Sequence, residues 1–151
     1  DGQIREFGPP TALYERPSSR EVMDFLGIAN WLQAEVIGAQ ASGNLIARVA
    51  GLRIELPAGC AAIGTRVDLG VRPEYVRFAD SDQTGDDLLA GTVAECVYKG
   101  GLVEVHVRLE NGQRIIARSG LQQVTDHGLD QLGATARLCI DPDRIQVFNA
   151  S

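Results

Sequence analysis

Cys96 and His106 are the residues of this sequence that come nearest to a catalytic pair. A thiol and an imidazole form a nucleophile and its base only when both side chains project from the same face of the sheet. If Gly100-Gly101 forms a tight turn, Cys96 lies opposite Val105 and points to the apolar side, away from His106. We therefore expect Cys96 to be a small core side chain rather than a nucleophile.

Lys99, the only lysine, precedes Gly100-Gly101 in a segment without the G-x-x-x-x-G-K-[ST] pattern of a phosphate-binding loop. A phosphate nest is one interpretation of the two glycines, but the alternating segments on either side favour a hairpin that pairs Tyr98 with Val103. His127 has no second histidine or cysteine at the spacing of metal ligands, so no metal site is expected.

A polar corner at Arg72-Pro73-Glu74 follows a strand of clean alternation. The favoured interpretation is a strand end with a structural ion pair; the functional alternative is a rigid corner that contacts a partner domain or a small ligand. Trp31, the only tryptophan, is more typical of a core or subunit contact than of ligand stacking. The candidate contact residues for a partner or effector are Arg72, Glu74, Tyr98, Lys99 and Trp31, and no catalytic residue is predicted.

Alternation of apolar and polar residues predicts strands over most of the chain after Trp31, each with one buried and one solvent face. Asn111-Gly112 predicts a two-residue type I′ turn. The expected strands are 52–56, 66–71, 93–98, 103–110, 113–117, 134–140 and 144–148.

Before Trp31 the sequence predicts a strand over 3–7 and two short helices. The first helical turn begins near Thr11. Ser18 and Glu21 form a capping box for the second helix, and Gly27 suits the position just after its end.

The chain has 151 residues and a net charge of -6, which argues against a protein that binds nucleic acid. It shows no membrane-spanning run and no signal peptide, and its three cysteines form no C-x-x-C pair, so a reducing, cytoplasmic location is expected. The acidic segment 80–87 divides the β region into two lobes of four to five strands. Lobes of this size can share a core or exchange strands.

Several segments resemble, in order, the C-terminal part of the ATPase subunit of bacterial ABC importers, which carries the transport-associated OB (TOBE) domain. The importers for iron, phosphonates or polyamines are the nearest group. The Walker and signature segments of that family precede the part seen here, so no catalytic residue can be assigned. The matching segments are Asp1-Gly2-Gln3-Ile4, Gly8-Pro9-Pro10, Leu13-Tyr14-Glu15-Arg16-Pro17, Phe25-Leu26-Gly27-Ile28-Ala29-Asn30, Val71-Arg72-Pro73-Glu74, Gly91-Thr92-Val93, Tyr98-Lys99-Gly100-Gly101, Asp141-Pro142 and Val147-Phe148.

The residue patterns and the resemblance agree on a mainly β fold: an OB-fold-like barrel or sandwich of two small lobes preceded by two short helices. Residues 1–28 are expected to be the tail of the ATPase domain, 29–79 the first β lobe, 80–87 the acidic loop and 88–151 the second β lobe.

The resemblance implies a regulatory and dimerising role in ATP-driven solute uptake. Its partners would be its own ATPase domain, a second copy of itself and, through the full protein, membrane permease subunits at the inner face of the cell membrane. ATP and Mg would bind in the ATPase domain, so no cofactor is expected in this segment.

A free-standing OB-type protein that binds a small ligand or an oligosaccharide is the alternative, because such small barrels need no missing half. An enzyme that uses Cys96 or Cys139 is a third hypothesis, and nothing in the sequence indicates its reaction.

Overall fold

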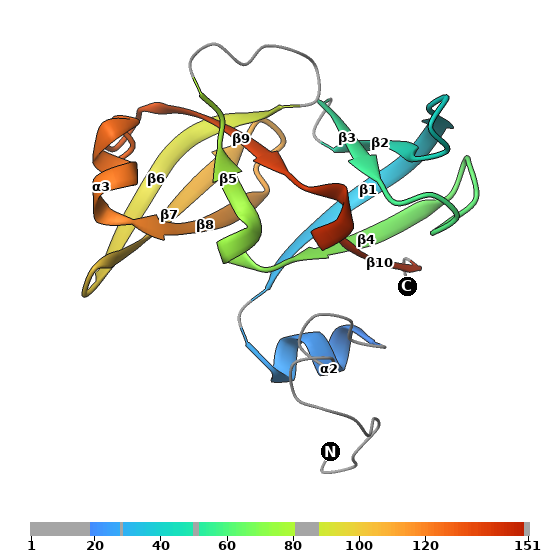
Figure 1. Ribbon diagram of the computed structural model, residues 1–151, viewed down its shortest axis with the longest axis horizontal. Helices are drawn as coiled ribbons and strands as arrows, with labels where there is room; N and C mark the ends of the chain where they lie inside the picture. The colour runs from blue at the N-terminus through green and yellow to red at the C-terminus, as the bar shows by residue number, and fades with distance from the viewer. Residues whose placement is uncertain (1–18, 28, 50–51, 81–87, 150–151) are drawn as a thin grey trace.

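The computed structural model describes residues 19–27, 29–49, 52–80 and 88–149 (Figure 1). The strand expected over 3–7 and the helical turn expected near Thr11 lie outside the described residues. The described part is mainly β, which confirms the predicted fold class. No helix within it is long and apolar enough to cross a membrane.

The first sheet has five antiparallel strands in the order β10-β4-β1-β2-β3. The expected strands over 52–56 and 66–71 are confirmed here. The strands are β1 (Asn30–Ala39), β2 (Leu45–Val49), β3 (Leu52–Leu56), β4 (Arg66–Val71) and β10 (Gln146–Asn149).

The second sheet also has five antiparallel strands, in the order β5-β9-β6-β7-β8. A short 3-10 turn, η1 (Pro73–Tyr75), leads into it, and a second one, η2 (Pro142–Arg144), leads out. The strands are β5 (Val76–Phe78), β6 (Leu89–Lys99), β7 (Leu102–Leu109), β8 (Arg114–Gly120) and β9 (Thr135–Ile140).

The two sheets exchange one strand each across the acidic segment. Strand β5 precedes this segment but pairs with β9 of the second sheet, whereas β10, at the end of the chain, pairs with β4 of the first. The buried side chains of both sheets form one continuous apolar cluster. The two lobes therefore share a core and are tied together by main-chain pairing at two crossings (Figure 1).

The turn at Gly100-Gly101 has the predicted register. Tyr98 lies opposite Val103, Cys96 lies opposite Val105, and Gly100 has φ +67°. A left-handed residue in a tight hairpin favours glycine, so the turn interpretation of the two glycines is confirmed.

The turn at Asn111-Gly112 differs from the predicted type I′ turn. The Leu109 N–H donates to the Gln113 carbonyl, the Gly112 N–H donates to the Leu109 carbonyl, and Gly112 has φ +89°. The register sets Leu109 opposite Gln113, which leaves a three-residue loop in which Gly112 takes the left-handed position. The loop has one residue more than predicted, so the turn type differs, but Gly112 still supplies the positive φ that the turn requires.

Helix α2 (Arg20–Phe25) confirms the second expected helix, but its N-cap residue is Ser19 rather than Ser18. The Ser19 Oγ accepts a hydrogen bond from the Val22 N–H at 3.2 Å, so the cap lies one residue later than predicted. Gly27 follows the C-cap residue Leu26, as predicted, and its φ of +154° lies in a region that glycine adopts more readily than other residues.

Strand β4 is buried on both faces, which corrects the solvent face expected for Asp68 and Gly70. Asp68 is 7% exposed, and helix α2 and Trp31 cover Gly70. A β-carbon on Gly70 would lie 2.6 Å from Met23 Sδ and 2.8 Å from the Trp31 ring. Strand alternation alone does not reveal that a helix from earlier in the chain covers the second face.

Helix α3 (Leu121–Asp126) was not predicted. Only Leu121 and Val124 give this segment an apolar helical spacing, and its N-cap residue, Gly120, has no capping side chain. Val124 is fully buried, so packing on the second sheet maintains this short helix.

Candidate functional site

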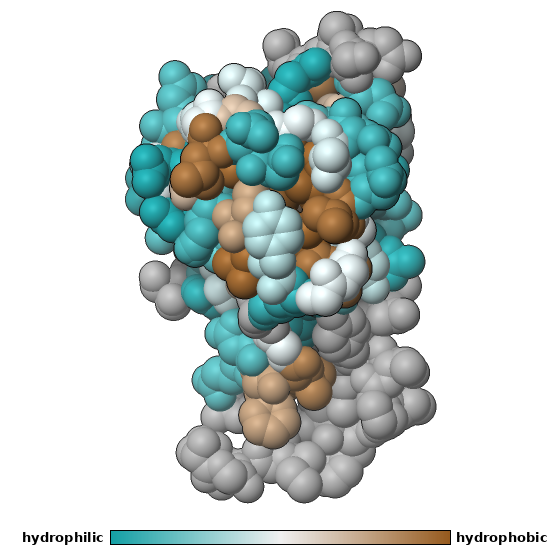
Figure 2. Space-filling model, turned by 90° about the vertical axis from the view of Figure 1, so that its left-hand side faces the viewer, coloured by the Kyte–Doolittle hydropathy of each residue, from teal (hydrophilic) through white to brown (hydrophobic). Residues whose placement is uncertain are grey.

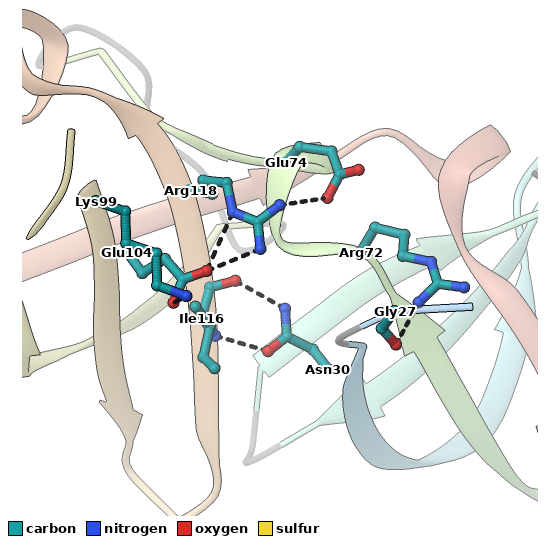
Figure 3. Close-up of polar contacts among 8 residues, drawn as sticks. All are labelled: Gly27, Asn30, Arg72, Glu74, Lys99, Glu104, Ile116 and Arg118. Carbon is teal, nitrogen blue, oxygen red and sulfur yellow. Dashed lines mark hydrogen bonds and ion pairs between the residues drawn. The ribbon is translucent and has the colours of Figure 1, made fainter. Parts of the chain in front are cut away.

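A buried carboxylate, Glu104 of β7, is the centre of the main polar cluster (Figure 3). Glu104 is only 4% exposed. Its Oε2 accepts hydrogen bonds from Arg118 Nε at 3.1 Å and Nη2 at 2.8 Å, and its Oε1 lies 3.3 Å from Lys99 Nζ. The strand register explains the first contact, because Arg118 of β8 lies directly opposite Glu104.

The carboxyl group of Glu104 is held in its charged form. Burial by itself raises the pKa of Glu104, but hydrogen bonds from Arg118 and Lys99, and the charges of both, more than offset burial and leave the pKa below its ordinary value. Two hydrogen-bonded cations thus satisfy a buried charge that would be costly alone.

Arg118 extends the cluster to the polar corner predicted from the sequence. Its Nη1 lies 3.7 Å from Glu74 Oε1, and Glu74 is placed by η1, where Pro73 begins the turn. We call Lys99, Glu104, Arg118 and Glu74 the Glu104 network. The structure therefore joins two predicted site residues, Lys99 and Glu74, through two that were not predicted.

Arg72 and Asn30 fasten the junction between the sheets and α2. Arg72 is 2% exposed, and its Nη1 donates to the Gly27 carbonyl at 2.8 Å. Asn30, at the start of β1, accepts from the Ile116 N–H at 2.7 Å and donates to the Ile116 carbonyl at 2.8 Å. Figure 3 shows both contacts beside the Glu104 network. Because β8 is an edge strand, the backbone N–H and carbonyl of Ile116 have no neighbouring strand on that side, and the Asn30 amide provides their hydrogen bonds instead.

Trp31 lies apart from the Glu104 network and packs helix α2 onto the first sheet. Its Nε1 donates to Asp24 Oδ1 at 2.7 Å, and its ring lies 5.8 Å from that of Phe148. The Arg20 guanidinium lies over the Trp31 ring at 4.3 Å and also binds Asp68 at 2.6 Å. Trp31 thus makes an intramolecular packing contact.

Tyr98 lies beside the turn of the β6–β7 hairpin and is 58% exposed. Leu102 and Leu121 are also exposed there, since the Leu121 N–H donates to the Gly101 carbonyl and brings α3 beside the turn. We call Tyr98, Lys99, Leu102 and Leu121 the hairpin surface. Figure 2 faces this end of the second sheet and shows apolar side chains among polar ones.

The remaining nucleophile and metal candidates do not assemble. Cys96 lies opposite Val105, as predicted, and donates from Sγ to the Leu129 carbonyl at 3.3 Å. Burial, then the charges of Asp130 and Glu95, raise the pKa of the Cys96 thiol. Within the part of the chain that the structure describes, no three His, Cys, Asp or Glu side chains gather as metal ligands.

The sequence interpretation missed Glu104, Arg118 and Asn30 as site residues. The predicted two-residue turn at Asn111-Gly112 sets Glu104 opposite Ser119, whereas the observed three-residue loop shifts the register by one and sets Arg118 opposite Glu104. Asn30 carries no local signal, since its partner Ile116 is distant in sequence.

Residues 69–148 match the protein family described as TOBE domain. Among the curated relatives, the spermidine/putrescine import ATP-binding protein PotA of Ruegeria pomeroyi is 36% identical over 118 residues, and the Fe(3+) ions import ATP-binding protein FbpC of Rhizobium etli is 41% identical over 116 residues. These matches cover 78% and 77% of this chain but 31% of each relative. The chain therefore spans about a third of the length of these import ATP-binding proteins.

Among solved structures, the cytoplasmic molybdate-binding protein ModG has a TM-score of 0.67 and 20% identity, with 80% of this chain and 96% of that chain covered. At this identity the likeness shows the fold alone, and it agrees with the predicted OB-type β architecture. Because the family match covers more than half of its residues and relatives of 36% and 41% identity support it, the chain belongs to the TOBE domain family.

Proposed function

We propose that this chain is the regulatory and dimerising part of the ATP-binding subunit of an ABC-type importer. The observation that carries the proposal is the match of the chain to a limited part of import ATP-binding proteins three times its length. ATP and Mg would bind in the region that precedes these residues. The subunit would work in the cytoplasm, against permease subunits at the inner face of the membrane.

A regulatory domain acts by favouring one arrangement of its subunits over another, and this requires different contacts in the two arrangements. A rigid domain is suited to this role, because a displacement at one of its surfaces is transmitted to the others rather than lost in internal deformation. The shared core, the two strand crossings, the Asn30–Ile116 contact and the Arg72–Gly27 contact support such rigidity in this chain.

The hairpin surface is the place we assign to contact with a second copy or an effector protein. Tyr98 and Leu102 are 58% and 48% exposed on the two faces of the hairpin beside its turn, and exposed aromatic and apolar side chains are typical of interfaces. Lys99 adds a charge at the same place, and its ion pair with Glu104 holds the ammonium group near the sheet. The Glu104 network then connects this surface to the polar corner at Glu74.

The test uses the full-length subunit encoded by the gene. We expect Tyr98→Ser to weaken self-association by at least tenfold in sedimentation measurements, and to alter how strongly permease subunits stimulate ATP hydrolysis. Leu132→Ser is the matched control, because Leu132 is 72% exposed and outside the hairpin surface. Unchanged association and unchanged stimulation in Tyr98→Ser would count against the proposal, as would a full-length protein that does not hydrolyse ATP.

The second candidate function is binding of a small ligand by a free-standing domain. In its favour, ModG carries the same fold over 96% of its length and is a molybdate-binding protein. Titration of this chain with molybdate, followed by the fluorescence of Trp31, distinguishes the two. Saturable binding at micromolar molybdate would favour the ligand-binding function, and no response would favour the importer subunit.

A further inference from the structure

The two sheets share one strand order. The first sheet has the order β10-β4-β1-β2-β3 and the second has β5-β9-β6-β7-β8, so strands β1 to β5 correspond in order to strands β6 to β10 (Figure 1). A bulge interrupts the pairing at corresponding places, between Val36 and Gly38 of β1 and between Val93 and Glu95 of β6. Positions in one half of the chain can therefore be matched with positions in the other.

The backbone around the bulges fixes the match at Val36 and Val93. Each valine carbonyl accepts a hydrogen bond from a glycine with positive φ, Gly64 at 2.7 Å or Gly133 at 2.8 Å. Each valine N–H donates to the carbonyl of the residue that follows this glycine, at 2.9 Å in both sheets. Because these main-chain contacts agree, Val36 and Val93 occupy the same position in their sheets.

The match identifies two pairs of arginines at corresponding positions. Arg48 of β2 lies directly opposite Arg53 of β3, and Arg108 of β7 lies directly opposite Arg114 of β8. Arg48 and Arg108 each come one residue after the partner of the matched valine. All four residues are exposed. We call them the two arginine pairs.

Each arginine pair places like charges face to face, which destabilises a sheet because Cβ atoms directly opposite each other are only about 4.5–5.5 Å apart. A charged residue on an edge strand deters pairing with a foreign strand, and β3 and β8 are edge strands. That benefit does not require the second arginine, on β2 or β7. Within the residues that the structure describes, no arginine of the two pairs forms an ion pair with an acidic side chain. An unfavourable arrangement that recurs at two matched positions indicates a use outside the chain.

The residues beside the arginine pairs leave both places positive. In the first sheet the same cross-strand row continues through Glu35 and Arg66, so three arginines and one glutamate give a charge of +2. In the second sheet the row continues through Thr92 and Thr135, so two arginines give a charge of +2. The whole chain has a net charge of -6, so these rows differ in sign from the chain that carries them.

We propose that the two arginine pairs are docking sites for acidic segments of another protein, with a carboxylate received between the two guanidinium groups of each pair. Guanidinium groups bind carboxylates through two parallel hydrogen bonds, and such charge-assisted bonds are strong. A protein partner fits exposed strand faces better than a small molecule does, because small-molecule sites are concave. Glu35, between two arginines of the first row, would repel a continuous phosphate backbone but can accept hydrogen bonds from a protein.

The arginine pairs are separate from the hairpin surface. Arg108 lies near the end of β7, whereas Leu102 of the hairpin surface begins that strand. A partner at the arginine pairs is therefore distinct from the second copy or effector protein assigned to the hairpin surface. The docking sites require only this chain's own residues, so they do not depend on the proposed function.

Calorimetric titration of the full-length protein with a hexaglutamate peptide tests the docking. We expect saturable binding that includes one peptide at each arginine pair. Arg53→Gln and Arg114→Gln should each weaken binding at one of these sites by at least tenfold. Arg77→Gln is the matched control, because Arg77 is an exposed arginine of β5 that lies opposite Cys139, and it should leave both sites intact. No binding of hexaglutamate, unchanged binding in Arg53→Gln and Arg114→Gln, or an equal loss in Arg77→Gln would overturn the proposal.

Other probes identify the kind of partner. Hexaglutamine should not bind, and inorganic phosphate and a short single-stranded DNA should bind at least tenfold more weakly than hexaglutamate. Tighter binding of either phosphate probe, lost in Arg114→Gln, would overturn the acidic protein in favour of a phosphate-bearing ligand.

Thermal unfolding of the same variants shows whether the arginines stabilise the sheets. Removing one arginine of a pair relieves repulsion, so Arg53→Gln and Arg114→Gln should keep the Tm of the parent or raise it. A fall of several degrees in either variant would give the arginines a structural role and overturn the docking. A full-length protein that does not hydrolyse ATP would count against the proposed function and would leave the docking sites unaffected.

Discussion

Replacing Glu104 with glutamine removes the charge at the centre of the Glu104 network while it keeps the shape of the side chain. In the parent chain Arg118 and Lys99 share the Glu104 carboxylate. In the variant they have at most a neutral amide oxygen as acceptor. Removing one partner of a fully buried pair costs about 3–5 kcal/mol. Here the side chains of Arg118 and Lys99 are 28% and 52% exposed, so water can take over part of the lost interaction.

We therefore expect Glu104→Gln to lower the free energy of unfolding by about 1–2 kcal/mol after discounting for solvent screening. For a chain of this length, that corresponds to a fall in Tm of roughly 3–6 °C. Urea unfolding followed by the fluorescence of Trp31, the only tryptophan, measures the change. The matched control is Arg108→Gln, an exposed position on the same strand, where the change should stay within about 0.5 kcal/mol.

The difference should depend on pH in one direction. The pKa of Glu104 in the folded chain lies below its ordinary value, so the stabilisation is present above the pKa of the unfolded chain, about 4.3. It is lost as the pH falls through the folded-state pKa. The gap between the parent chain and Glu104→Gln should therefore be full at pH 7 and should narrow below pH 4.3.

Two results would refute this reasoning. One is a gap that stays constant from pH 7 down to the acid limit of folding. The other is additivity in the double-mutant cycle of Glu104→Gln with Arg118→Gln, because a shared hydrogen-bonded ion pair requires a coupling energy of about 0.5 kcal/mol or more.

Three further outcomes are expected. Gly70→Ala, which pushes a β-carbon into the contact with α2, should lower the free energy of unfolding by about 1–3 kcal/mol, whereas Gly101→Ala meets no atom within 4 Å and should change it far less; equal urea midpoints would contradict the close approach. Asn30→Ala should cost about 1–3 kcal/mol, because it leaves the backbone groups of Ile116 without the amide, and exchange of the Ile116 amide, which should accelerate, is the check. Cys96 should react with a thiol reagent at pH 8 more slowly in the native chain than in urea, because its raised pKa reduces the thiolate; equal rates would argue against this.

Local sequence patterns predicted the strands and turns of this fold, but they did not predict which distant residues pack against each strand. The Gly100-Gly101 turn set the register of β6 and β7, and from it the position of Cys96 opposite Val105. The covered face of β4 could not be read in the same way. Its cover is Met23, which belongs to a helix earlier in the chain, and strand alternation carries no record of distant partners.

The candidate site shows the same limit at smaller scale. Lys99 and Glu74 were predicted as contacts, each from its own segment, but the residues that join them were not. The predicted two-residue turn at Asn111-Gly112 places the strand after it one residue out of register and so hides the pairing of Arg118 with Glu104. Alternation also predicts a solvent face for Glu104, which lies between two buried valines. The length of a loop decides which side chains meet across a hairpin, and a shift of one residue changes every pair.

The exchange of strands between the sheets also governs how the chain can fold as it leaves the ribosome. Val147 pairs with Leu69, and Phe78 pairs with Leu138, so each sheet lacks a strand until residues 138 to 147 have been made. Pairings this distant in sequence are slow to form, because the chain loses the entropy of closing a long loop before the stabilising contacts form. Any domain translated earlier can already be folded by then. The shared core of the two sheets is therefore complete only after β9 and β10 have been made.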